Sequence, residues 1–321
     1  MKGYEILVAS YENKEVDATE KGKLMDKIKL LASTPNPQNR YELGQLIAFS
    51  VDSILDKRLN WLENIADTRR GAVGDNPEFK VPYSGLIAKI GAKGGTPEVS
   101  MVFNKRVTID TYDVSIRPKV DFAQLAQNPE LIMKMIEEAA VAIENAMVVD
   151  IQDKLYTTFA ALSAPNYASG AGIVKATFDD QLRAIQRFGM VSIIGDITQI
   201  HQLTALAGFS TRVADDLMIE HNNRRHLGTY LGASVNELEN RYLDDSSLAE
   251  TNLLLRDDLV YGLYTGDTNS RPLKVYYGGD LRVMERTNPE DESIEYFMRV
   301  TFGSLVVGNQ KRMFIYEDTN E

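Results

Sequence analysis

The chain has 321 residues, no cysteine and a formal net charge of −11, from 46 acidic and 35 basic side chains. The lack of cysteine excludes disulfides, thiolate metal sites and a cysteine nucleophile, and the negative charge argues against binding duplex DNA by charge alone. No segment has the ~20 consecutive apolar residues of a membrane span. We therefore expect a soluble protein made in the cytoplasm, with one large domain or two smaller ones.

The first part of the chain is predicted to be an arm followed by a long helix. The arm, residues 1–38, holds a short helix at Lys23–Leu31 that stops at two closely spaced prolines. Asn39 is expected to cap the next helix, with Glu42 as its capping-box partner. One stripe of apolar residues then predicts a single helix of about 27 residues that ends before Gly71. The stripe consists of Leu43, Ile47, Val51, Leu55, Leu59, Leu62 and Ile65.

Residues 78–118 are predicted to be extended, with two long strands around a glycine-rich tip. Phe79–Tyr83 leads into the stretch GLIAKIGAKGGTP. After this tip, apolar and polar residues alternate from Val99 to Ile116, with a phase shift near Tyr112 that indicates a β-bulge. Because an isolated two-stranded ribbon is barely stable in water, we expect this hairpin to lie against something else, such as another copy of the chain.

The tip has four glycines and two lysines, as a phosphate-binding loop would. Such a loop requires G-x-x-x-x-G-K-[ST] followed by a helix N-terminus. Here Gly91 is followed by alanine, and Lys93 is followed by Gly94 and Gly95. The residues after Pro97 have the pattern of a strand. We therefore interpret the stretch as the tip of a hairpin and expect no nucleotide there.

A second long helix is predicted at Asn128–Leu162, because an Asn-Pro-Glu sequence marks its start. Its apolar residues at helical spacing are Ile132, Met135, Ile136, Ala139, Ile143, Met147, Ile151, Leu155 and Phe159. After a linker at 163–177, the pattern predicts a helix at Phe178–Phe188 and a buried strand at Met190–Asp196 that ends at the cap of a helix, Ile197–Leu206.

The remaining chain is predicted to consist of short strands. They are expected within 227–239 and at Leu253–Leu255, Leu259–Tyr264, Val275–Tyr277, Leu281–Arg286, Glu295–Val307 and Lys311–Tyr316. No βαβ unit recurs and no repeat of fixed period is present, so the chain is predicted to be mixed α+β.

No catalytic or metal-binding pattern emerges. His221 and His226 are five residues apart, whereas a helical zinc pair requires four, and His201 lies in a separate predicted helix. The serine elbow G-x-S-x-G is absent. Acidic pairs occur at Asp179-Asp180, Asp215-Asp216, Asp244-Asp245 and Asp257-Asp258. Such pairs on polar segments are typical of a solvated surface, so we assign no catalytic residue, no metal and no cofactor.

The order of these elements resembles that of the HK97-fold major capsid proteins of tailed bacteriophages. The stretches MVSIIGDITQIHQL, HLGTYLGASVNELE, LRDDLVYGLYTGD and VYYGGDLRVME are similar to segments of that family's axial domain. The resemblance implies an α+β, HK97-like capsid fold divided into an N-terminal arm and helix (1–70), an extended E-loop hairpin (71–118), a peripheral domain with a long spine helix (119–164), an axial domain (165–282) and return strands of the peripheral domain (283–321).

The resemblance also implies a structural function without enzymatic activity. Many copies would form the pentamers and hexamers of an icosahedral phage head that encloses double-stranded DNA. The implied partners are copies of the chain, a portal protein, a possible decoration protein and packaged DNA by non-specific proximity, with no membrane. Because the chain begins with only a short arm, a separate scaffolding protein is expected. The protein would reside in the virion after assembly in the host cytoplasm.

Residue roles follow from the same resemblance. The tip of the E-loop would contact a neighbouring subunit through Lys89, Gly91, Lys93, Gly94 and Gly95. One member of the family crosslinks an E-loop lysine to an asparagine of a neighbour, which makes Lys89, Lys93 and Asn309 crosslink candidates. Two alternatives stay open from the sequence: an encapsulin-type shell around a cargo enzyme, and a soluble enzyme with an unrecognised carboxylate site.

Overall fold

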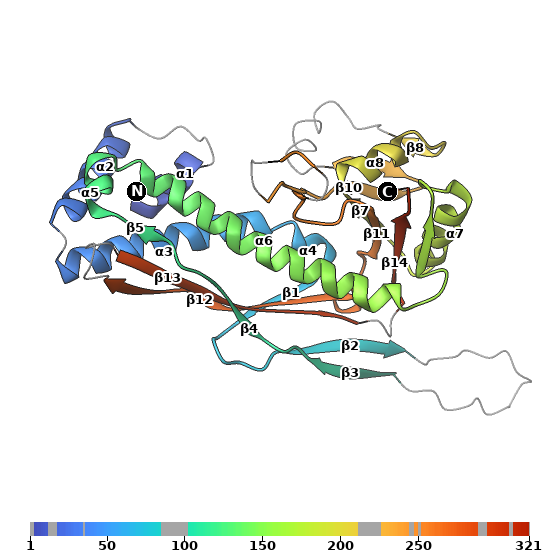
Figure 1. The fold of residues 1–321 in the computed structure, drawn as a ribbon. Coiled ribbons are helices and arrows are strands. Elements are labelled where there is room, and N and C mark those ends of the chain that lie inside the picture. The colour runs from blue at the N-terminus through green and yellow to red at the C-terminus, as the bar shows by residue number, and fades with distance from the viewer. Residues whose placement is uncertain are drawn as a thin grey trace, which may run out of the picture.

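The computed structural model describes residues 3–11, 18–34, 36–84, 102–210, 226–243, 247–249, 252–287, 294–307 and 311–320. They form a five-stranded sheet, a seven-stranded sheet, a two-stranded hairpin and a set of helices (Figure 1). Helix α6 (Leu131–Ala160) runs along the molecule from the N-terminal helices to the seven-stranded sheet. The hairpin of β2 (Glu78–Ser84) and β3 (Val102–Thr108) projects from the body. The mixed α+β class is confirmed.

The helices before the first strand are α1 (Gly3–Tyr11), α2 (Ala18–Ser33), α3 (Pro37–Leu59) and α4 (Leu62–Ile65). The expected cap at Asn39 is wrong. The cap of α3 is Asn36, whose side chain accepts a hydrogen bond from the backbone N–H of Asn39 at 2.8 Å. Pro37 then takes the start of the helix, where a missing N–H leaves no hydrogen bond unmade.

The single helix expected up to Gly71 is broken into two. Helix α3 ends at Leu59, and α4 follows after a short turn. Leu62 and Ile65 are buried, as are the stripe residues of α3. The apolar spacing therefore continues across the turn and does not reveal it. The chain then enters strand β1 (Asp67–Gly71), which was not predicted.

The five-stranded sheet contains β1, β12 (Leu273–Thr287), β13 (Ile294–Val306), β4 (Tyr112–Ile116) and β5 (Lys119–Val120). Strand β1 lies at one edge and runs parallel to β12, and the other pairs are antiparallel. Helix α3 packs against β12 and α6 packs against β13. The short helix α5 (Phe122–Gln127), which was also not predicted, packs against α2 near the N-terminal end of α6.

The hairpin is shorter than expected. Strands β2 and β3 pair antiparallel, with Glu78 opposite Thr108. The second strand does not continue to Ile116, because the chain leaves the hairpin after Thr108 and β4 joins β13 in the five-stranded sheet. The phase shift near Tyr112 marks this change of sheet and not a bulge.

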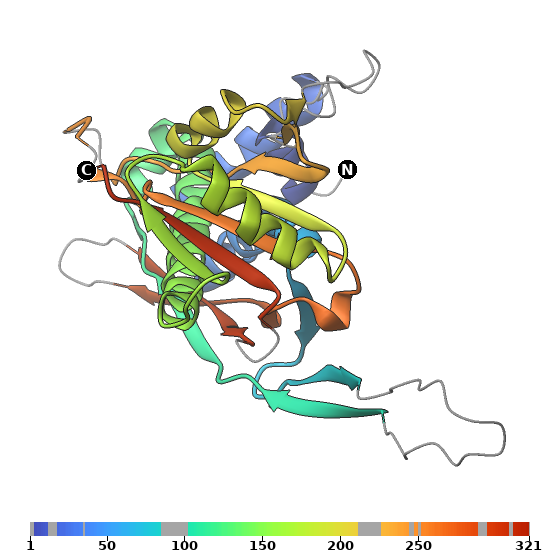
Figure 2. The ribbon, with the colours of Figure 1, turned by 90° about the vertical axis from the view of Figure 1, so that its right-hand side faces the viewer.

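The seven-stranded sheet has the order β6 (Tyr167–Gly170), β14 (Met313–Asp318), β11 (Leu259–Tyr264), β7 (Val191–Gly195), β10 (Ala233–Glu237), β9 (His226–Tyr230) and β8 (Phe209–Ser210). Helix α7 (Lys175–Gln186) lies across this sheet (Figure 2). The predicted strand, cap and helix around Asp196 are confirmed: its side chain accepts from the N–H of Thr198 at 2.8 Å, and α8 (Ile197–Thr204) follows.

The structure departs from the predicted segments in four places. Strand β12 runs through the expected division at 282/283 and pairs with β13 along its length, with an irregularity at Gly278. Strand β14 joins the seven-stranded sheet and not the return strands, because its mostly buried residues lie between β6 and β11. The linker expected at 163–177 contains β6, and the strand expected at Leu253–Leu255 is only an isolated bridge. The division into named domains stays a prediction.

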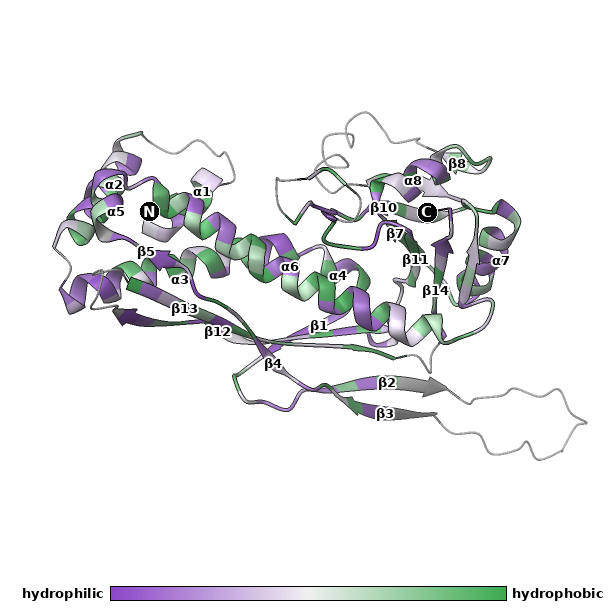
Figure 3. Cartoon of the chain, viewed as in Figure 1, coloured by the Kyte–Doolittle hydropathy of each residue, from purple (hydrophilic) through white to green (hydrophobic). Residues whose placement is uncertain are grey.

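Two apolar clusters form the body. The larger one joins the N-terminal helices, α6, the five-stranded sheet and one face of the seven-stranded sheet. The second lies between the other face of that sheet and helices α7 and α8. Hydrophobic and hydrophilic residues alternate along α6 in Figure 3, and its stripe from Ile132 to Phe159 lies in the larger cluster. Among the described helices, none is both long and apolar enough to cross a membrane.

Candidate assembly site

A small cluster fixes the base of the β2–β3 hairpin to the body. Phe79 is fully buried and packs with Ile109 and with Tyr276 of β12. The guanidinium of Arg69 lies 4.4 Å from the centre of the Phe79 ring and donates a hydrogen bond to the carbonyl of Glu78 at 2.9 Å. One apolar cluster and one arginine therefore hold the ribbon, which would be marginal alone.

A buried ion pair lies beside this anchor. Lys274 of β12 is 0% exposed, and its Nζ lies 2.9 Å from Oδ2 of Asp67 and donates to the carbonyl of Asn269 at 2.8 Å. Burial lowers the pKa of Lys274, although its hydrogen bond to Asp67 acts in the opposite direction. The pair ties β1 to β12 and to the 3₁₀ turn η3 (Thr268–Ser270), which contacts β2.

The opposite face of the hairpin is basic and exposed. Lys80 lies directly opposite Arg106 in the strand register, so both side chains point to the same face. The Arg106 side chain is 70% exposed and lies 3.1 Å from Glu78. The hairpin therefore buries an apolar face on the body and presents cations outward.

The predicted contact residues cannot be placed. Lys89, Gly91, Lys93, Gly94 and Gly95 all lie in 85–101, and the crosslink candidate Asn309 lies in 308–310, outside the described residues. Their roles stay predictions.

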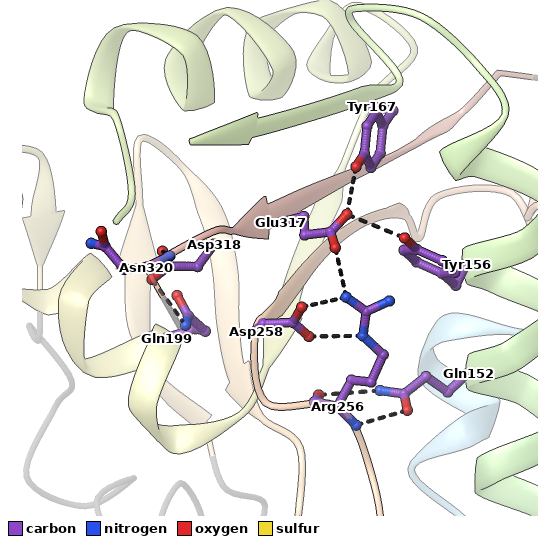
Figure 4. Close-up of polar contacts among 9 residues, drawn as sticks. All are labelled: Gln152, Tyr156, Tyr167, Gln199, Arg256, Asp258, Glu317, Asp318 and Asn320. Carbon is purple, nitrogen blue, oxygen red and sulfur yellow. Dashed lines mark hydrogen bonds and ion pairs between the residues drawn. The ribbon is translucent and has the colours of Figure 1, made fainter. Parts of the chain in front are cut away.

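A polar cluster joins α6 to the seven-stranded sheet (Figure 4). Arg256 binds Asp258, and its guanidinium also donates to Oε1 of Glu317 at 2.6 Å. The hydroxyls of Tyr156 and Tyr167 donate to Oε2 of the same glutamate. One carboxylate on β14 thus receives donors from α6, from β6 and from the segment before β11.

Gln152 of α6 completes this junction. Its amide accepts from the backbone N–H of Arg256 at 3.0 Å and donates to the carbonyl of the same residue at 3.3 Å. The guanidinium of Arg256 also lies 4.4 Å from the ring centre of Tyr156. Burial acts to raise the pKa of Glu317, but hydrogen bonds from Tyr167 and Arg256 outweigh it and hold that pKa below its usual value. The junction fixes the long helix against the sheet.

Two of the acidic side chains noted in the sequence are held in ion pairs. Asp179 accepts from the Tyr230 hydroxyl at 2.6 Å and binds Lys175 at 2.8 Å, and Asp258 binds Arg256. Within the part of the chain that the structure describes, no three metal-ligating side chains lie together. Of the three histidines, only the side chain of His201 is described, and it is exposed on α8.

Sequence reasoning missed the junction. Gln152 is a buried polar residue beside the apolar stripe of α6, and this was the available signal. Its partner Arg256 lies 104 residues further along the chain, so spacing alone could not pair them.

A sequence-family model described as "SPbeta prophage-derived putative capsid protein YonB" matches residues 5–315. The match covers nearly the whole chain. The chain belongs to this family. Its role as a phage capsid protein follows from that membership, and the HK97-like resemblance seen in the sequence is confirmed. A search of curated proteins gives no significant match.

Solved structures share the fold at low sequence identity. A structure from Mycobacterium phage Bobi has a TM-score of 0.52 and 11% identity over 80% of this chain and 89% of that one. The capsid of an empty GTA particle has a TM-score of 0.51 and 13% identity, over 80% of this chain and 88% of that one. The SrpI encapsulin of Synechococcus elongatus has a TM-score of 0.51 and 8% identity, over 80% of this chain and 86% of that one. These likenesses show the fold, whereas the family match distinguishes the capsid protein from the encapsulin.

Proposed function

We propose that this capsid protein is the major shell-forming subunit of a phage head. Copies assemble into the pentamers and hexamers of an icosahedral shell that encloses double-stranded DNA, and the chain has no enzymatic activity. The observation that carries the proposal is the hairpin, which leaves the body and presents a basic face outward from a chain of net charge −11. A ribbon of two strands gains stability when another surface covers it.

The parts of the subunit take the roles that the fold suggests. The arm (1–70) links capsomers, the hairpin within 71–118 lies over a neighbouring subunit, and the helix within 119–164 forms the spine of the peripheral domain. Residues 165–282 form the axial domain and 283–321 the return strands, except that β14 pairs within the seven-stranded sheet. The tip residues Lys89, Gly91, Lys93, Gly94 and Gly95 contact the neighbour.

The assembled shell has further partners. A separate scaffolding protein directs assembly in the host cytoplasm and a portal protein occupies one vertex. A decoration protein is a further candidate partner. The packaged DNA lies close to the shell without specific contacts, which is consistent with the acidic chain. Lys89 or Lys93 with Asn309 are candidates for a covalent link between subunits, which boiling in detergent would leave intact on a gel.

Negative-stain electron microscopy of the purified protein, alone and with its scaffold, tests the proposal. We expect capsomers or closed shells. A protein that stays monomeric under both conditions contradicts it. Deletion of residues 86–96 supplies a second test, because the lone ribbon lacks an intrachain core. The variant should keep its circular dichroism spectrum and assemble poorly; global unfolding would instead place the tip in the core of the subunit.

The fold alone does not separate a phage capsid protein from an encapsulin, because the TM-score to SrpI equals that to the GTA capsid. The family match favours the phage capsid protein. Gene neighbours separate the two: portal and terminase genes favour the phage head, and an adjacent cargo enzyme gene favours the encapsulin. The contents of purified particles separate them as well, since a phage head holds DNA and an encapsulin holds protein.

A further inference from the structure

A pocket of about 290 Å³ lies between α3 and β12, next to the edge strand β1. Its charged lining residues are Asp52, Asp56, Glu63, Arg70 and Asp280. We call it the α3 pocket. Among the described strands, β1 lies at the edge of the sheet, so none of them covers this side.

The α3 pocket carries more negative charge than its own cation neutralises. Arg70 donates two hydrogen bonds to Asp56, each at 2.8 Å. Among the described residues, Asp52 accepts one hydrogen bond, from the backbone N–H of Leu281 at 3.3 Å. Burial raises the pKa of Asp52 to about 6, and repulsion from Asp56 and Asp280 adds to the shift. A second cation at Asp52 would be stabilised electrostatically.

Four of the uncharged lining residues are apolar, beside the polar side chain of Asn60. Leu55 and Leu59 of α3 lie on one side, and Tyr277 and Val300 of the sheet contribute the rest. A lysine or arginine has the matching form, because its aliphatic stem lies along apolar surface while its charged end meets a carboxylate. A bare metal ion matches less well, since the described carboxylates do not form a group that could hold one.

The hairpin is the basic segment of this acidic chain. From Glu78 to Thr108 there are five basic residues and two acidic ones, a net charge of +3 within a chain of −11. Two of the basic residues, Lys80 and Arg106, lie directly opposite one another. Glu78 on the same face pairs with Arg106 at 3.1 Å and offsets part of this charge. An acidic surface against the face would offset the charge that remains.

The β2 and β3 strands of a subunit point away from its own α3 pocket. The hairpin base is fixed on β12 through Phe79, and β2 and β3 lead away from α3 in Figures 1 and 2. We propose that the α3 pocket of one copy receives a basic side chain from the β2–β3 hairpin of a second copy. The inference rests on the proposed assembly function and names the surface that the hairpin contacts.

Disulfide trapping tests this contact, because the natural chain has no cysteine to interfere. Asn60→Cys places one thiol at the pocket. It is combined in turn with Lys80→Cys, Lys89→Cys, Lys93→Cys or Arg106→Cys. After mild oxidation of assembled particles, at least one pair should give a ladder of linked subunits on a non-reducing gel.

The matched control pairs each hairpin cysteine with Lys134→Cys, whose side chain is 76% exposed on α6. If particles assemble but no pair with Asn60→Cys crosslinks more than the same hairpin cysteine with Lys134→Cys, the inference is wrong. The proposed function is then unaffected. Failure of the unmodified protein to assemble overturns both.

Charge reversal is the second test. Asp52→Lys should lower the assembled fraction at least about tenfold, equivalent to about 1.4 kcal/mol per contact. Asp180→Lys, at a position 81% exposed on α7, is the control and should assemble normally. The hairpin residue that crosslinks to Asn60→Cys is then changed to glutamate in the Asp52→Lys variant. This second substitution should restore assembly. Equal assembly of Asp52→Lys and Asp180→Lys contradicts the inference.

Discussion

Phe79 and Phe178 are both fully buried, yet they lie in very different surroundings. Phe178 packs edge-to-face on Phe314, with 5.3 Å between ring centroids, and also on Tyr230 and Tyr316, inside the core of the seven-stranded sheet. Phe79 belongs to a cluster of three buried side chains and lies beside the cation of Arg69. The two side chains are equally buried, but Phe79 has fewer buried apolar neighbours. We therefore expect the hairpin to detach before the body unfolds.

The largest expected effect is at the aromatic core. Phe178→Ala should lower the free energy of unfolding by about 3–5 kcal/mol, because it leaves a cavity among three aromatic rings. Denaturant titration followed by circular dichroism measures the loss. Phe79→Ala is the matched variant, and it should lower the free energy of unfolding of the whole subunit clearly less than Phe178→Ala does. Its effect should appear as faster amide exchange in 78–84 and 102–108. Equal global losses would show that the hairpin base is part of the main core.

Next comes the buried ion pair beneath the hairpin. Lys274→Met should cost about 3 kcal/mol, since it removes the nearer cation of the buried Asp67 carboxylate and leaves Arg69, 3.6 Å away. Adding Asp67→Leu should recover most of the loss, because replacing both members with apolar groups removes the uncompensated charge. If the double variant is no more stable than Lys274→Met, the pair contributes through packing and not through charge.

A smaller effect is expected at the junction between α6 and the seven-stranded sheet. Gln152→Ala removes two hydrogen bonds to the backbone of Arg256 and should cost about 1–2 kcal/mol. Glu138→Ala, on an exposed face of the same helix, should stay within about 0.5 kcal/mol of the parent. Identical titration curves for the two variants would mean that the junction does not hold the helix.

The smallest effect concerns pH. The pKa of Asp52 is about 6 in the folded chain, above the ordinary value near 4, and the groups facing it are Asp56, Asp280 and Arg70. Between about pH 4 and pH 6 the folded state therefore binds more protons, so the free energy of unfolding falls as pH rises through this window. Asp52→Asn should remove this fall and raise the free energy of unfolding by roughly 1 kcal/mol at pH 8, allowing for solvent screening. Parallel pH profiles of variant and parent would contradict this.

Local signals in the sequence predicted much of the fold. The stripe of α6 and the strand that ends at the cap of Asp196 depend on residues within one or two turns, and both are present. The cap of α3 was misplaced by three residues, because Asn36-Pro37 was read as a break and not as a start. The end of the hairpin was missed because β4 continues the alternation in a different sheet.

The candidate surfaces were less accessible from sequence. The basic hairpin could be recognised, since its residues are contiguous. The α3 pocket could not, because it joins Asp52 to residues near Leu281, a separation of 229 residues. Its charge excess appears only when α3, β1 and β12 are placed side by side. Contacts between remote segments depend on topology, which spacing along the chain does not encode.

The most direct measurement is a cryo-electron microscopy reconstruction of particles purified from cells that produce the chain with its scaffold. We expect a closed icosahedral shell with fivefold and sixfold capsomers, in which each hairpin lies over the next subunit. A small closed oligomer, or a monomer with the hairpin folded against its own body, would contradict the assignment of this chain as the shell-forming subunit.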